Sequence, residues 1–135
     1  MPVYTCTTTI EAIDRGTKRD LAAEITRIHA EINQVPTTYV NVVFHEVPPE
    51  NLYTDSVPAM SLLINGWVRR GHPTAETTRL ALEIAQASSR ITGLPARNVL
   101  IVIQSSPASA AVEGGRVLPE PGQEAAWMAE KRLDD

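Results

Sequence analysis

Cysteine, aromatic residues and clustered positive charge are all scarce in this 135-residue sequence. The single cysteine, Cys6, cannot form an internal disulfide, which suits the reducing cytoplasm. Aromatic residues make up only 4% of the chain and Lys and Arg form no block, so nothing supports a nucleic-acid partner. No apolar run approaches the ~18 residues of a membrane-spanning helix, and the first residues lack the features of a secretory signal. We therefore expect a cytoplasmic protein that binds neither nucleic acid nor a membrane.

What the sequence does have is an internal repeat. When the chain is shifted by 59 positions, residues 21–25 (LAAEI) align with 80–84 (LALEI), and 40–44 (VNVVF) align with 99–103 (VLIVI). The length and the 43% hydrophobic content suffice for one buried core. We expect a single domain over residues 1–135, built from repeats 2–59 and 60–111 and a C-terminal tail, 112–135.

Each repeat shows the pattern of a strand, a helix and a second strand. Strands are predicted at 2–9, 38–47, 60–69 and 98–104, where β-branched and apolar residues are concentrated. Between them, apolar residues recur at i, i+4, i+7 and i+11, which places them on one helical face. The two stripes are Leu21, Ile25, Ile28 and Ile32, and Leu80, Ile84, Ala87 and Ile91.

The helix ends are also marked in the sequence. Thr17 and Thr74 are predicted to cap the two helices, because a Thr hydroxyl can accept a hydrogen bond from a free backbone N–H. Pro36 is predicted to end the first helix and Gly93 the second.

Two strand–helix–strand units predict an α/β (α+β) fold, because each crossover makes its two strands parallel. The expected result is a four-stranded sheet with two helices on one face and the other face left for a partner. In the tail, Gly114-Gly115, Pro119 and Pro121-Gly122 predict turns, and 124–133 predicts a short helix. We expect Val117, Leu118 and Trp127 of the tail to pack on a neighbouring chain, so we predict a homo-oligomer.

The second residue has unusual chemistry if Met1 is removed, as an initiator Met before a small residue normally is. An internal proline nitrogen is an amide, whereas Pro2 at the chain start carries a secondary amine that can take or give a proton. Burial or a nearby cation lowers the pKa of such an amine. A neutral amine near pH 7 is a competent general base.

Four stretches stand out beside the repeat. They are Pro2-Val3-Tyr4, Arg27-Ile28-His29, residues 66–71 (GWVRRG) and residues 112–122 (VEGGRVLPEPG). With the two tandem units, they resemble the tautomerase superfamily (a 4-oxalocrotonate tautomerase-like, or MIF-like, fold), and in particular the cis-3-chloroacrylic acid dehalogenase subgroup. The resemblance spans nearly the whole chain and implies a trimer that packs its open sheet faces about a threefold axis.

The resemblance also implies roles for single residues. Pro2 corresponds to the catalytic proline, His29 to a helix-borne histidine, Arg69 to a substrate-binding arginine and Glu113 to the acid that activates water. Two positions depart from the family pattern. His72 stands where the family has a second arginine, and it is a further candidate for substrate binding as a donor or cation. Val102 stands where the family has a tyrosine.

Other candidates are weighed on the residues themselves. Arg70 is the neighbour of Arg69 and is a further candidate for substrate binding, although on a strand its side chain points the other way. Cys6 and His45 are expected to be structural residues. No His, Cys, Asp or Glu cluster has metal-ligand spacing and no glycine-rich phosphate loop occurs, so we expect no metal and no cofactor.

Three functions remain open at this point. The first is a cofactor-independent tautomerase, in which Arg69 holds the carboxylate of a small enol or keto acid, Pro2 shuttles a proton and His29 donates a hydrogen bond. The second is a hydrolytic dehalogenase or hydratase of 3-haloacrylate-like acids, with Pro2 as acid and Glu113 activating water. The third is a non-catalytic oligomeric module of the same fold.

Overall fold

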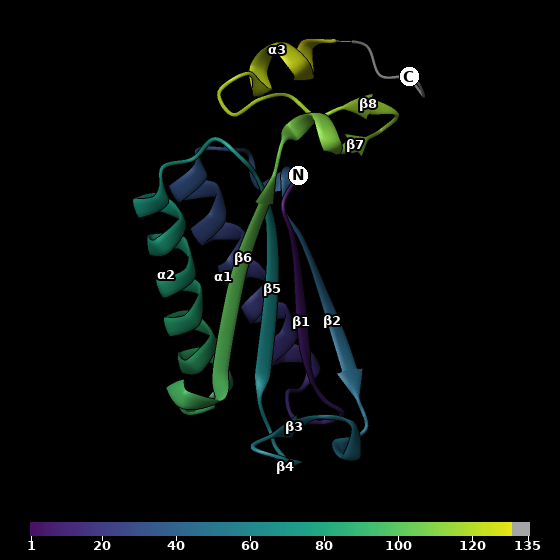
Figure 1. Ribbon diagram of the computed structural model, residues 1–135, viewed down its shortest axis with the longest axis vertical. Helices are drawn as coiled ribbons and strands as arrows, with labels where there is room; N and C mark the ends of the chain where they lie inside the picture. Colours follow the sequence, from purple (N-terminus) through teal and green to yellow (C-terminus); the bar gives the residue numbers. More distant parts are fainter. Residues whose placement is uncertain (131–135) are drawn as a thin grey trace.

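A four-stranded sheet is the centre of this computed structural model, which describes residues 1–130 (Figure 1). The strand order is β2-β1-β5-β6; β1 pairs with β2 and β5 with β6 in parallel, while β1 and β5 are antiparallel. The main elements are β1 (Val3–Thr9), α1 (Arg15–Asn33), β2 (Asn41–Val47), β5 (Leu62–Arg69), α2 (Thr74–Thr92) and β6 (Val99–Ser106). The predicted fold of two tandem units is confirmed.

Both helices cover one face of the sheet, as the apolar stripes predict. All but one of the eight stripe residues are buried, and Ile91 is half-buried beside them. On the strands, alternate residues such as Tyr4, Cys6 and Ile64 point into this core. The opposite face leaves apolar side chains exposed, which are Val3, Val43, Leu100 and Val102.

The helix starts differ from the prediction. Asp14, not Thr17, caps α1, because its carboxylate accepts a hydrogen bond from the Thr17 backbone N–H at 2.8 Å. Pro73 holds the cap position of α2 without a side-chain hydrogen bond, and Thr74 is the first helical residue. The predicted ends hold: α1 stops before Pro36, and Gly93 closes α2 in the left-handed conformation.

Strand bounds shift by a few residues. Each strand that follows a helix is preceded by a short 3-10 helix, η1 (Thr37–Tyr39) or η3 (Ala96–Asn98), so β2 begins at Asn41 rather than 38. The strand β5 begins at Leu62 rather than 60, and β6 continues to Ser106.

Two small hairpins were not predicted. The first, β3 (Tyr53–Thr54) with β4 (Val57–Pro58), follows η2 (Pro49–Asn51); the second, β7 (Val112–Glu113) with β8 (Arg116–Val117), follows η4 (Ala108–Ala110). The offset of 59 residues that relates the two halves also relates these hairpins. The repeat pattern therefore continues past residue 111 into the predicted tail.

The tail lies across the end of the sheet at which the chain begins (Figure 1). Its helix α3 (Glu124–Ala129) is shorter than predicted, and residues 131–133 of the prediction lie outside the described part. Leu118 and Trp127 are buried against Met1, Val35 and Tyr39 of their own chain. Their predicted packing on a neighbouring chain is therefore wrong, although Val117 stays exposed. None of the helices within residues 1–130 combines the length and apolar character needed to cross a membrane.

Candidate active site

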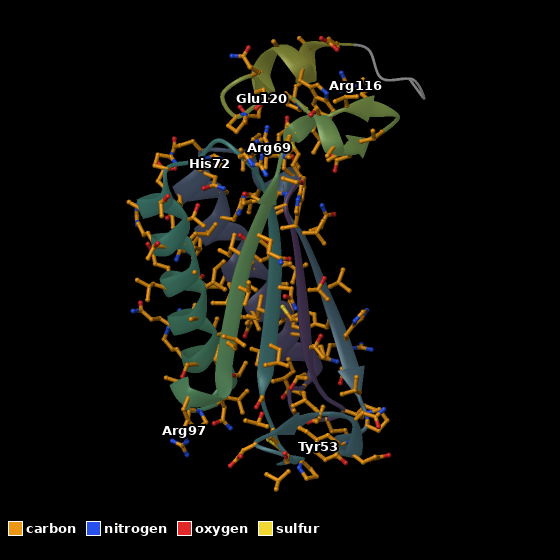
Figure 2. The ribbon with its side chains drawn as sticks, in the orientation of Figure 1. Tyr53, Arg69, His72, Arg97, Arg116 and Glu120 are labelled. Atoms are coloured by element: carbon orange, nitrogen blue, oxygen red, sulfur yellow. The ribbon has the colours of Figure 1, made fainter. Side chains whose placement is uncertain are left out.

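The candidate site lies where the start of β1 meets the end of β5. Antiparallel pairing places Val3 opposite Trp67, which brings Pro2 beside Val68 and Arg69. A small cavity of about 10 Å³, room for roughly one water molecule, lies there. Its lining is Pro2, His29, Asn33, Val35, Val68, Arg69 and His72. Figure 2 shows Arg69 and His72 at this end of the molecule, below the tail.

Met1 fills the space next to this cavity. Met1 is 4% exposed and packs with Tyr39, Leu118 and Trp127. Its amino group donates a hydrogen bond to the Tyr39 carbonyl oxygen. While Met1 is present the nitrogen of Pro2 is an amide, so the one amine at this place belongs to Met1.

The surroundings of that amine favour its neutral form. Burial lowers the pKa of the Met1 amino group to about 6, the negative charge of Glu113 opposes this shift, and the positive charge of Arg69 adds to it. The Met1 amino group is therefore mostly unprotonated at pH 7. The environment that a proton-accepting amine requires is built into the end of the sheet.

Arg69 is buried and held by the tail. Its exposed fraction is 5%; one Nη donates to the Pro119 carbonyl oxygen at 2.6 Å, and the other lies 2.7 Å from a carboxylate oxygen of Glu124. Partial burial raises the pKa of Glu124, but the hydrogen bond from Arg69 and those from backbone N–H groups outweigh it and leave the pKa lowered. This carboxylate is thus charged at neutral pH, and an arginine guanidinium is always charged in proteins.

His29 is a buried, neutral imidazole. Its Nδ1 lies 2.7 Å from the Tyr4 hydroxyl, and the Asn33 side-chain amide lies 3.4 Å from its Nε2. Burial lowers the pKa of His29 to about 3, with further contributions from the N-terminal amine, His72 and Arg69. The ring therefore acts as a hydrogen-bonding group rather than as a cation.

His72 and Arg70 are the other two candidates for substrate binding, and their surroundings differ. His72 lines the cavity, and its Nδ1 lies 3.5 Å from a carboxylate oxygen of Glu76. Arg70 is exposed and does not line the cavity with Pro2; it lines a neighbouring hollow. The structure therefore brings Pro2, His29, Arg69 and His72 together around one cavity. The neighbouring hollow is lined by Arg70 together with Arg69 and His72.

The remaining predicted residues do not line the cavity. Glu113 is half-buried on β7 and affects the amine through its charge, although it does not line the cavity. Val102 is exposed on the open sheet face, away from the cavity, and so is His45. Cys6 is fully buried in the core, where burial raises the pKa of its thiol to about 12, which suits a structural role.

Three further residues at this end were not predicted. Tyr4 and Asn33 hold His29, and Glu124 holds Arg69. The contact of Asn33 with His29 could have been predicted from the sequence, because residues four positions apart lie side by side on a helix. Within residues 1–130, no three His, Cys, Asp or Glu side chains are grouped so that they could hold a metal ion.

The family model described as "Putative oxalocrotonate tautomerase enzyme" matches residues 1–132. The chain belongs to the tautomerase superfamily. The fold resemblance extends to N1, a member of the cis-3-chloroacrylic acid dehalogenase family, with a TM-score of 0.92, 25% identity and coverage of 98% of this chain and 94% of that chain.

Two other solved structures extend the comparison. Ps01740 is 31% identical, with a TM-score of 0.80 over 82% of this chain and 99% of that one. A fused 4-OT, solved as an asymmetric trimer, is 16% identical, with a TM-score of 0.79 over 85% and 94% of the two chains, and shares the fold. No curated protein matches the sequence.

Proposed function

We propose that the chain, after loss of Met1, is a cofactor-independent tautomerase of a small enol or keto carboxylic acid. The observation that carries this proposal is the buried amine environment at the chain start, where the pKa of the Met1 amino group falls to about 6 beside Arg69. Loss of Met1 places the secondary amine of Pro2 at this end of the sheet and empties the space that the Met1 side chain fills. The resulting hollow has apolar walls and a few polar groups, as small-molecule sites do.

In the proposed reaction, the residues have separate tasks. Arg69 binds the substrate carboxylate with those of its five N–H groups that Pro119 and Glu124 leave free. Neutral Pro2 takes a proton from the enol oxygen or from carbon and returns it to another carbon. His29, fixed by Tyr4, offers a hydrogen bond without adding charge, and His72 lines the same cavity.

The alternative is hydrolytic dehalogenation or hydration of a 3-haloacrylate-like acid. The likeness to N1 and the charge effect of Glu113 on the amine favour it. Against it stands Val102, because the family tyrosine expected to assist water activation is replaced there by an exposed valine. We rank it below tautomerisation, and a non-catalytic module third.

The test begins with the intact mass, which must show that Met1 is absent. The parent and a Pro2→Ala variant are then compared on phenylenolpyruvate and on cis-3-chloroacrylate. We expect ketonisation of the enol by the parent and at least about a hundredfold loss in the variant, the size typical of a lost general base. Equal rates in the two proteins would eliminate the tautomerase. Halide release that Glu113→Gln abolishes would select the dehalogenase instead.

We also propose a homotrimer formed through the open sheet face, in the cytoplasm. The exposed apolar residues of that face and the trimeric fused 4-OT structure support the assembly. The single cysteine, Cys6, supports the compartment.

A further inference from the structure

The contact between Arg69 and Glu124 sets the charge of the site. The Glu124 carboxylate is bound on one side by Arg69 and on the other by the Gly122 backbone N–H, at 3.0 and 3.2 Å from its two oxygens. Side-chain exposure is 4% for Arg69 and 14% for Glu124, so water screens this pair weakly. The positive charge of Arg69 is therefore largely compensated before any substrate arrives.

The other titratable side chains that line the cavity are two histidines. His29 is neutral, and the ring of His72 lies beside the Glu76 carboxylate. The half-buried Glu113 places a further negative charge near the amine. The amine is mostly neutral at pH 7, so Arg69 is the one guanidinium among the residues that line the cavity, and Arg70 lines a neighbouring hollow.

We propose that Glu124 determines the charge of the substrate, so that the site accepts acids with one carboxylate and rejects those with two. This inference rests on the proposed function and deepens it. Arg69 has five N–H donors, of which Pro119 and Glu124 engage two, so it can share a first carboxylate with Glu124. A second carboxylate in the same small cavity meets the negative charges of Glu124 and Glu113, and Arg69, the one guanidinium in the lining, is already paired with Glu124.

The test compares two dienols that differ in one group. These are 2-hydroxypentadienoate, with one carboxylate, and 2-hydroxymuconate, with a second carboxylate at the far end. Glu124→Gln keeps a hydrogen-bonding side chain for Arg69 and removes the charge. Glu130→Gln is the matched control, because it removes a carboxylate from the same segment that pairs with Arg116 at 3.4 Å rather than with Arg69.

We expect Glu124→Gln to raise kcat/KM for the dicarboxylate, relative to that for the monocarboxylate, about tenfold through KM. Glu130→Gln should leave the ratio between the two substrates as in the parent. An equal change for both substrates, or no change for either, overturns the proposal, since a merely structural role does not discriminate between them.

Binding measurements on the parent separate this inference from the proposed reaction. Calorimetry with crotonate and with fumarate, which replaces the methyl group of crotonate by a second carboxylate, requires no turnover. Tighter binding of crotonate supports charge selection even if Glu124→Gln does not fold, and equal or tighter binding of fumarate refutes it. If neither dienol reacts, or if Pro2→Ala reacts as the parent does, the tautomerase fails while the binding result still stands.

Discussion

At the scale of single residues, the amine at the chain start is governed by three influences. Burial and the charge of Arg69 lower the pKa of the amine there, whereas Glu113 raises it. On the proposed loss of Met1, we expect the same three influences to act on Pro2, with less burial because the space of the Met1 side chain is emptied. Burial, the largest of the three influences, and the opposed charges of Glu113 and Arg69 then set the pH at which Pro2 becomes a base.

The first prediction concerns the pH dependence of activity. If Pro2 acts as a base, kcat/KM on phenylenolpyruvate rises with pH and levels off, with a midpoint below the ~7.7–8.0 of an ordinary α-amino group. Glu113→Gln should move this midpoint to lower pH, because it removes the charge that raises the pKa of the amine. A rate that falls with rising pH would show that Pro2 acts as an acid, and a midpoint that moves upward in Glu113→Gln would contradict the assigned charge effect.

The second prediction concerns His29 and stability in acid. Its pKa is about 3 in the folded chain and ~6.5 in an unfolded one, so below pH 6.5 the unfolded chain binds a proton that the folded chain does not. The free energy of unfolding should therefore decrease as the pH falls from ~6.5 toward ~3, by up to ~1.4 kcal/mol per pH unit from this group. Urea titrations of the parent and of His29→Gln at several pH values measure the slope. The variant should lose this part of it, and identical slopes would refute a neutral, buried His29.

At the scale of elements, strand β5 leaves room for the Tyr4 side chain that holds His29. Tyr4 on β1 lies opposite Gly66 on β5, and a Cβ at Gly66 would stand 2.7 and 2.9 Å from two carbons of the Tyr4 ring. Glycine at this position thus lets the ring lie over β5, and the ring hydroxyl then holds His29. A small residue in one strand orients a histidine in a helix.

The third prediction is that Gly66→Ala destabilises the fold by about 1–3 kcal/mol, the usual cost of overpacking a core. It should also reduce activity, because the displaced Tyr4 ring no longer positions His29. Gly16→Ala in α1 is the control, since a Cβ there meets only Asp14 Oδ1 at 3.6 Å and alanine favours helices. Denaturant unfolding and kcat/KM are measured for both variants. A Gly66→Ala protein as stable and active as the Gly16→Ala protein would contradict the proposed support.

The sequence predicts the elements better than the contacts between them. The stripes Leu21–Ile32 and Leu80–Ile91 specify two helices, because periodicity is a local property that each helix carries by itself. The cap of α1 was misplaced, since Asp14 and Thr17 are both competent caps and only the backbone geometry selects one. The contacts of Arg69 with Pro119 and Glu124 join residues some fifty positions apart, and no local pattern encodes them. Pro2, His29 and Arg69 were predicted because they belong to a family pattern, whereas Glu124 was not.

At the scale of the whole molecule, the open sheet face requires a partner. Strand register aligns Val43, Thr5, Asn65 and Val102 in one row across all four strands. Both ends of this row are apolar and 43% exposed. Apolar side chains presented together by a sheet face are typical of a surface that associates.

The fourth prediction is that Val43→Lys and Val102→Lys convert the assembly into monomers. Each substitution places an ammonium group within the proposed interface, where the charge would have to be buried without a partner. Sedimentation equilibrium should give three times the 14.7 kDa chain mass for the parent and the mass of one chain for the variants. Leu82→Lys is the matched control, because Leu82 is an exposed leucine (57%) on the helical side and should leave the trimer intact. If the parent sediments as a monomer, or if the two valine variants stay trimeric, the open face is not the interface.

The same variants test whether the site needs a partner subunit. The Pro2 cavity and its described lining belong to one chain. A folded monomer that still ketonises phenylenolpyruvate would therefore show that assembly supplies no essential group to the site.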